Sequence, residues 1–207
     1  MVSVKTLIRE GEHQTQDFKF RIDDQKKIAR TLAAFANTDG GRLQIGVKDN
    51  GKIAGVNPEE EFHMVQGAAQ MYCRPPVQIE SRIWQEDMRL VLEISVEPAP
   101  QRNHYAVDED GKWKIFIRRK DHTLLANKIL LKVWNFEKQG ILKPQSFGEE
   151  ELRCIRIIES EARVTLSRLY KMLDIQKQKV DHLLALLVHW RIVDMQISEE
   201  GVFYSIL

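Results

Sequence analysis

The sequence predicts an α+β fold, with a mixed β-sheet and packed helices followed by a small winged-helix domain. Two observations support this prediction. In the first two-thirds of the chain, alternating strand patterns are interspersed with helical patterns and hairpin signals, which favours a mixed or antiparallel sheet. After a predicted linker at residues 144–148, three helical segments precede two short strands, the layout of a winged helix. The predicted domains are therefore residues 1–143 and 149–207.

The first predicted elements are a strand at residues 17–21 and a helix at 23–38. In the helix, apolar residues recur at helical spacing, and an aspartate at position 23 or 24 is suited to cap its N-terminus. The pair Gly40-Gly41 predicts the end of this helix, because glycine adopts positive φ without steric cost.

The next segment predicts a hairpin. An alternating strand at 42–47 leads to Asp49-Asn50-Gly51, which suits a type I′ turn, and residues 52–56 are expected to return as the partner strand. The same stretch is one residue short of the phosphate-loop pattern G-x-x-x-x-G-K-[ST]. Ile53 stands where Ser or Thr would ligate Mg²⁺, and a strand rather than a helix is expected to follow. We therefore predict a turn with Lys52 exposed.

The remaining elements follow from the same periodicities. A helix is expected at 59–73, stopped by two prolines, and an alternating hairpin is centred on Glu86-Asp87. A strand at 113–119 precedes a helix predicted over 123–139, which ends at a glycine. The helices predicted after the linker span 149–162, 165–174 and 176–190, and two short strands fill 192–207.

Composition limits the possible functions. Of 207 residues, 43% are apolar and 29% charged, which is ordinary for a folded protein. A net charge of +1 gives no bulk signal for nucleic acid, so such binding would need a local basic patch. We expect no signal peptide and no membrane span. Cys73 and Cys154 are expected to be reduced and buried, with a disulfide as the alternative, and both states fit a cytoplasmic protein.

Four motifs occur in a set order. They are Glu12 with Asp17-Phe18-Lys19, AFANTDGG at 34–41, LQIGVKD at 43–49, and the element from Ile117-Arg118 to Ala126. Over roughly residues 8–130, this order resembles the Schlafen-type AlbA domain. The resemblance implies an AlbA-like sheet. Prokaryotic members often carry a C-terminal winged helix and are described as transcriptional regulators or DNA-binding proteins, and some carry an ATP-binding label.

The resemblance also implies a candidate catalytic site. Nuclease-active Schlafen relatives use three carboxylates, which by motif fall on Glu12, Asp17 and Asp49. Three convergent carboxylates can hold Mg²⁺ or Mn²⁺ and lower the pKa of a bound water for attack on a phosphodiester. This sequence departs from the pattern by an Asp at position 17 in place of Glu, and by Lys48 in place of an acidic residue. The alternative is that these carboxylates are a hairpin residue and exposed charges around a strand.

Basic residues mark a first candidate surface for nucleic acid. Residues 1–147 hold 23 basic and 20 acidic side chains. Lys and Arg side chains in a stripe contact phosphates without regard to sequence, although a solvated charged face explains any one of them equally well. The candidates are Lys19, Arg21, Arg42, Arg118, Arg119 and Lys120.

The predicted helix at 176–190 is the second candidate surface. Gln178, Lys179 and His182 lie where a recognition helix contacts base edges or phosphates. Against this, residues 148–207 hold 8 basic and 10 acidic side chains. The second half of the helix, which includes Ala185, is apolar nearly all round, and such a helix is usually packed on every side. Contact with protein is therefore the alternative.

These expectations combine into one hypothesis with alternatives. The lead is a nucleic-acid-binding protein that regulates transcription through a basic AlbA-like groove on DNA or RNA. The resemblance also implies a homodimer, since animal Schlafen cores pair two such lobes and this chain has one. The alternatives are a Mg²⁺- or Mn²⁺-dependent endoribonuclease and an ATP-binding or protein-interaction module.

Overall fold

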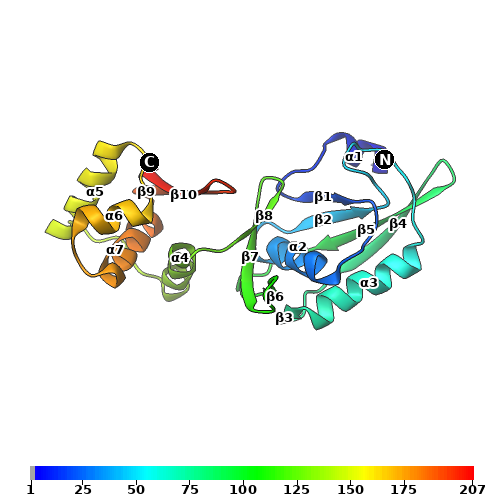
Figure 1. Ribbon diagram of the computed structural model, residues 1–207, viewed down its shortest axis with the longest axis horizontal. Helices are drawn as coiled ribbons and strands as arrows, with labels where there is room; N and C mark the ends of the chain where they lie inside the picture. The colour runs from blue at the N-terminus through cyan, green and yellow to red at the C-terminus, as the bar shows by residue number, and fades with distance from the viewer. Residues whose placement is uncertain (1–2) are drawn as a thin grey trace. The chain divides into compact units, whose positions relative to one another are not determined.

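The computed structural model describes residues 3–207, and its contacts divide the chain into two compact units. The first runs to Leu125 and the second from Ala126 onward. Each unit combines helices with sheet, so the predicted α+β class is confirmed (Figure 1).

The first unit is built on a mixed four-stranded sheet. Its strands lie in the order β1-β2-β5-β4, with β1 parallel to β2 and the other pairs antiparallel. The mixed sheet predicted from the hairpin signals is therefore present. The strands are β1 (Gln16–Lys19), β2 (Gly41–Ile45), β4 (Glu80–Glu86) and β5 (Arg89–Val96).

A second, antiparallel sheet lies on the other side of helix α2 (Gln25–Asn37). Its order is β3-β6-β7-β8, formed by Cys73–Arg74, Tyr105–Val107, Trp113–Arg119 and His122–Leu125. The side chain of Asp24 accepts hydrogen bonds from Lys26 N and Lys27 N, which confirms the expected N-cap. Figure 1 shows α2 between the two sheets, so its apolar residues are buried on several sides.

Helices cover both faces of the mixed sheet. On one face, α2 and α3 (Pro58–Met71) share a core with Leu43 and Ile94. On the other, α1 (Val4–Arg9) contributes Val4 to a smaller cluster with Phe18 and Val91. Neighbouring residues of β5 are therefore buried on opposite faces, as is usual for a strand covered on both sides.

The Gly40-Gly41 pair is explained by close approach as well as by backbone freedom. Gly40 has a φ of +72°, and a Cβ there would lie 2.7 Å from the carbonyl oxygen of Val96. A Cβ at Gly41 would lie 2.5 Å from the ring of Phe35. Both positions therefore require glycine for α2 to turn directly into β2.

Two local predictions were wrong. The hairpin turn is centred on Asp49 and Asn50: Gly51 N donates to Lys48 O, and Gly51 alone of these turn residues has a positive φ. The predicted type I′ turn needs two such residues, so it does not form here. Residues 52–56 make only an isolated bridge, because β5 already occupies the edge of β2 where they were expected to pair.

The predicted helix at 123–139 begins too early. Residues 123–125 belong to β8, and α4 spans Lys128–Gln139 with Asn127 as its N-cap. The helix ends as predicted at Gly140, which has a φ of +66°. The sequence did not reveal the boundary between β8 and α4, since Leu124 and Leu125 fit a strand and a helix equally well.

The second unit places three helices and a hairpin around its own core. They are α5 (Glu149–Glu161), α6 (Leu166–Leu173), α7 (Lys177–His189), β9 (Val193–Ser198) and β10 (Gly201–Ile206). Helix α4 packs against α7, and its Ile129 and Val133 share a core with Leu184 and Ala185. The chain's contacts thus separate after Leu125, whereas the predicted first domain extends to residue 143 and includes α4.

Both cysteines are free and buried, as predicted. Burial raises the pKa of the Cys73 thiol to about 12 and that of Cys154 to about 11. Each therefore remains a protonated thiol near neutral pH. Within residues 3–207, no helix is both long and apolar enough to cross a membrane.

Candidate nucleic-acid interface

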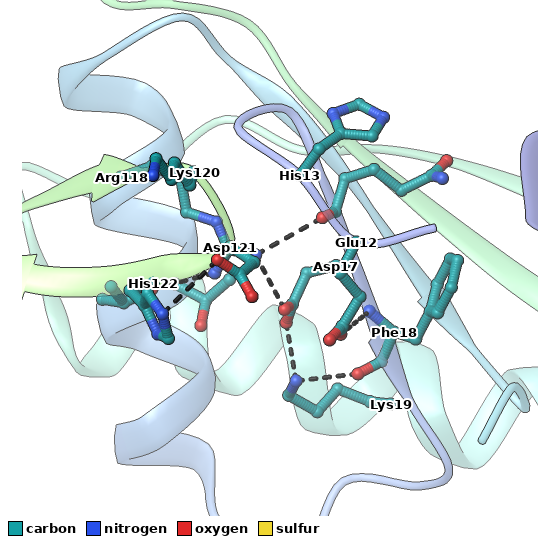
Figure 2. A network of polar contacts seen from close by, with 12 residues as sticks. Glu12, His13, Asp17, Phe18, Lys19, Arg118, Lys120, Asp121 and His122 are labelled. Carbon is teal, nitrogen blue, oxygen red and sulfur yellow. Dashed lines mark hydrogen bonds and ion pairs between the residues drawn. The ribbon is translucent and has the colours of Figure 1, made fainter. Parts of the chain in front are cut away.

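A buried ion pair joins the two sheets of the first unit. Arg118 on β7 donates through Nη2 to Asp17 Oδ1 of β1 at 2.9 Å, and to the carbonyl oxygen of Gln16 at 3.3 Å (Figure 2). The side chains are only 2% and 5% exposed, and the guanidinium carbon lies 5.3 Å from the centroid of the Phe35 ring. Arg118 was expected to contact nucleic acid, but its burial leaves it no access to a phosphate.

Lys19 is the second cation on Asp17. Its Nζ lies 2.7 Å from Asp17 Oδ2 and donates to the carbonyl oxygen of Phe18, also at 2.7 Å. The Asp17 carboxylate thus has a cation on each oxygen (Figure 2). The E-x4-D-F-K order explains this geometry, because Asp17 and Lys19 are two apart on a strand and share one face.

Glu12 lies beside this ion pair. Its Oε1 accepts a hydrogen bond from Phe18 N at 2.8 Å. Partial burial raises the pKa of its carboxyl above the ordinary value of 4.5, and the negative charge of Asp17 raises it further, while the bond from Phe18 N opposes this. The structure thus places Glu12 beside Asp17, two of the three carboxylates that the family resemblance singled out.

The predicted metal site does not fit this geometry. The charge of Asp17 is already balanced by Arg118 and Lys19, so a divalent ion would have to displace both. Asp49 is an exposed turn residue. Among residues 3–207, no three His, Cys, Asp or Glu side chains are grouped so that they could hold a metal ion. The Mg²⁺ or Mn²⁺ site of Glu12, Asp17 and Asp49 stays a prediction that this arrangement does not support.

A glutamine that the sequence did not single out fixes the turn between β7 and β8. Gln14 Oε1 accepts from Lys120 N at 2.8 Å, and Gln14 Nε2 donates to Arg118 O at 2.9 Å and to Asp39 Oδ2 at 2.8 Å. The turn is therefore held against the segment that carries Glu12. No sequence signal marks the contact with the turn, since Arg118 and Lys120 lie more than 100 residues from Gln14.

Two cations on this turn are open to solvent. Arg119 and Lys120 are exposed, and neither side chain forms an ion pair with any residue in the described range 3–207. The other basic candidates of the first unit, like Arg118, have nearby carboxylates. The partners of Lys19, Arg21 and Arg42 are Asp17, Asp23 and Glu10, at 2.7, 2.8 and 3.9 Å.

The candidates on α7 lie on its exposed side. Gln178, Lys179 and His182 are all exposed, but Lys179 Nζ lies 2.6 Å from Glu150 Oε1 and the ring of His182 packs edge-on against Phe136 at 5.3 Å. The apolar half of α7 is covered by α4 of the same unit, which accounts for the apolar pattern. Ala185 in this half is fully buried by the contact.

The phosphate-loop alternative lacks its structural context. The turn after β2 is followed by the single bridge from Val47 to Ile53 and opens no helix. Lys52 instead lines an open surface pocket of about 330 Å³ with Arg9 and Arg89. A phosphate loop requires a helix N-terminus at this point, so the turn is not one.

Residues 12–127 match the family described as Schlafen, AlbA_2. No curated protein matches the chain. The crystal structure of the DIP2311 protein from Corynebacterium diphtheriae is 16% identical with a TM-score of 0.44, covering 91% of this chain and 34% of that one. The chain thus spans about a third of the length of that protein.

A second solved structure is the N-terminal domain of a protein from Nitrosomonas europaea, which its description relates to the ATP-dependent DNA helicase RecG. It is 19% identical with a TM-score of 0.41, and the match covers 72% of this chain and 100% of that one. The family match spans more than half of the chain and includes Glu12, Asp17, Lys19 and Arg118. The chain belongs to the Schlafen AlbA_2 family.

Proposed function

We propose that the protein binds nucleic acid through the surface formed by residues 12–20 and the β7–β8 turn. The observation behind this proposal is the pair of exposed cations Arg119 and Lys120, which form no ion pair within residues 3–207 and lie on a turn that Gln14 fixes in place. Fixed cations bind phosphates with less loss of side-chain freedom than cations on a mobile loop. Membership of the Schlafen AlbA_2 family supports the same assignment.

The finer parts of the proposal concern regulation and assembly. We infer a cytoplasmic transcriptional regulator that acts as a homodimer, in which two copies bring two basic surfaces to one nucleic acid. The second unit would serve as a winged helix. The acidic balance of residues 148–207 and the Lys179–Glu150 pair favour contact with protein over contact with DNA.

Salt-dependent binding tests the central proposal. Fluorescence anisotropy with the full chain, on duplex DNA and on structured RNA at several salt concentrations, should show affinity that falls as salt rises. Replacing Arg119 and Lys120 together by Ala should reduce the slope of log affinity against log salt by about 2, one for each lost phosphate contact.

The matched control is Lys138→Ala with Lys171→Ala, which removes the same charge from exposed positions of the second unit. This control variant should show the same slope of log affinity against log salt as the wild type. Affinity that is independent of salt, or equal losses in both double variants, would contradict the proposal.

The endoribonuclease alternative has one specific observation in its favour. Glu12 lies beside a second carboxylate and has a raised pKa, a combination that is common in acid–base sites. Incubation of structured RNA with the wild type and with Glu12→Gln, each with and without Mn²⁺, tests it. The alternative predicts cleavage by the wild type that is lost in the variant, and equal cleavage by both would exclude Glu12.

A further inference from the structure

Phe20 is an exposed aromatic residue at the edge of this surface. Its side chain lies directly after β1 and is 47% exposed, while the nearby Phe18 and Phe35 are 2% and 0% exposed. Of the eight phenylalanines in the chain, it alone is exposed. Burying a phenylalanine is favourable by about 2 kcal/mol, so leaving this one in water gives up stability that the fold gains at the others.

Two cations flank the ring. Lys48 Nζ lies 5.4 Å and Arg21 Cζ 6.0 Å from its centroid. Both lie over the ring within the roughly 6 Å of a cation–π contact, near its outer limit, and they leave Phe20 47% exposed to solvent. Their positive charge also makes the neighbourhood unsuited to an apolar protein partner, which needs a wider apolar patch.

The backbone fixes the ring and Lys48 relative to one another. Gly46 N and Val47 N both donate to the carbonyl oxygen of Lys19, at 2.8 and 3.2 Å, so the chain after β1 is bonded to the chain after β2. Phe20 and Lys48 extend from these two bonded segments. The ring and its flanking charge are therefore positioned before any ligand arrives.

An exposed aromatic face between cations suits one chemical class of ligand. The bases of single-stranded nucleic acids stack on aromatic side chains while Lys and Arg follow the backbone. In a duplex the base faces are stacked on one another and cannot reach such a ring. The surface therefore fits an unpaired nucleotide better than a base pair.

We propose that Phe20 is a stacking platform for an unpaired base, with Lys48 and Arg21 contacting the adjacent phosphates. The inference rests on the proposed nucleic-acid-binding function and adds its substrate class: single-stranded DNA or RNA, or an unpaired loop. Arg21 also pairs with Asp23 at 2.8 Å, so Lys48 is the main phosphate contact of the two.

The test compares full-length variants on two probes of equal length, a single-stranded 12-mer and a duplex 12-mer. Phe20→Ala should weaken single-strand binding about tenfold, the effect of one lost base stack. Binding to the duplex should change much less. Phe20→Trp keeps an aromatic face and should restore single-strand binding, while Lys48→Ala should lower the salt slope by about 1.

Met88→Ala is the control for the loss of an exposed apolar side chain, because Met88 is 91% exposed. It should bind both probes as the wild type does. Thermal unfolding of Phe20→Ala should match the wild type, since an exposed ring contributes little to stability.

The outcomes separate the two proposals. If the wild type binds neither probe at any salt concentration, the nucleic-acid function fails and the inference fails with it. If the wild type binds the single strand and Phe20→Ala binds it equally well, only the stacking inference is overturned. Equal losses on both probes would overturn it as well, because the ring would then not distinguish unpaired bases.

Discussion

The two units each contain a carboxylate shared by two polar partners, and the two networks differ in burial. In the first unit, Asp17 binds Arg118 and Lys19, and the Arg118 side chain is 2% exposed. In the second, Asp181 binds Lys128 at 2.7 Å and accepts a hydrogen bond from the Tyr170 hydroxyl, and the Lys128 side chain is 53% exposed. Both carboxylates are buried, at 4% and 7% exposed, so the networks differ in the burial of Arg118 and Lys128.

This difference assigns different roles to the networks. The Asp17 network ties β1 to β7 beneath the candidate surface, where Arg118 cannot regain water if its partner is lost. The Asp181 network ties α4 to α6 and α7, and Lys128 can be solvated without leaving its place. Breaking a buried pair leaves a charge buried without a partner, whereas breaking a half-exposed pair mainly loses hydrogen bonds. The predictions below test this contrast.

The largest effect is expected for Arg118→Met. It leaves the Asp17 carboxylate buried with Lys19 as its single cation, so we expect a loss of about 3–5 kcal/mol in the free energy of unfolding. Urea-induced unfolding followed by circular dichroism measures this. A loss below about 1 kcal/mol would show that water or Lys19 compensates for the missing guanidinium.

The neighbouring Arg119→Ala is the matched control, since it removes the same charge from an exposed position on the same strand. We expect a change within about 0.5 kcal/mol. Adding Asp17→Leu to Arg118→Met should recover part of the lost stability, because it removes the buried carboxylate that Arg118 no longer pairs with.

A smaller loss is expected for Asp181→Asn. The change removes a charge from a residue that is 7% exposed and weakens two hydrogen bonds, so we expect a loss of about 1–2 kcal/mol. The same unfolding experiment measures it. A loss as large as that of Arg118→Met would contradict the contrast in burial.

The pH dependence of Lys128 provides an independent check on that network. The hydrogen bond to Asp181, followed by that to Tyr170, raises the pKa of Lys128 above its ordinary 10.5. A raised lysine pKa contributes stability that is complete below pH 10.5 and is lost as the pH rises through the higher folded value. The melting temperatures of wild type and Lys128→Met should therefore differ by a constant amount from pH 7 to 10 and converge above that range.

The residues of the first network could be singled out from sequence, but their pairing and burial were missed. The motif singled out Glu12 and Asp17 as candidate metal ligands and Lys19 and Arg118 as candidate phosphate contacts, without predicting that they pair with one another. Arginine is seldom fully buried, so Arg118 was expected at the surface. Strand alternation held a signal against this, because positions 116 and 118 share a face and Phe116 belongs to the core.

The second network could not be predicted from sequence. It depends on α4 packing with the helices that follow it, and the predicted linker at 144–148 separated α4 from them. Local patterns gave the helices α5, α6 and α7 almost residue by residue, but which helix covers the apolar side of α7 is a long-range property. Gln14 is similar, since its contacts on β7 are distant in sequence.

A still smaller effect, of opposite sign, is expected for Glu12→Gln. Burial, aided by the charge of Asp17, raises the pKa of Glu12, so ionisation of this carboxyl opposes folding. Gln mimics the protonated acid and can still accept from Phe18 N. The melting temperature of the variant should therefore be higher than that of the wild type at pH 7.

This difference in melting temperature should vanish below the ordinary pKa of 4.5, where Glu12 is protonated in both folded and unfolded chains. A variant that is less stable at pH 7 would show that the ionised carboxylate is needed for the fold.

The smallest effect is expected for Lys179→Ala, which breaks the Lys179–Glu150 pair. Both side chains are well exposed, at 53% and 40%, so the free energy of unfolding should change by less than about 0.5 kcal/mol. The variant is more informative in a DNA-binding assay, where it is compared with Glu150→Ala, which breaks the same ion pair from the other side. If α7 contacts DNA, freeing Lys179 by Glu150→Ala should tighten duplex binding and Lys179→Ala should weaken it. If the second unit contacts protein instead, both variants should bind duplex DNA as the wild type does. If the two variants shift duplex binding in opposite directions, α7 contacts DNA, contrary to the proposed contact with protein.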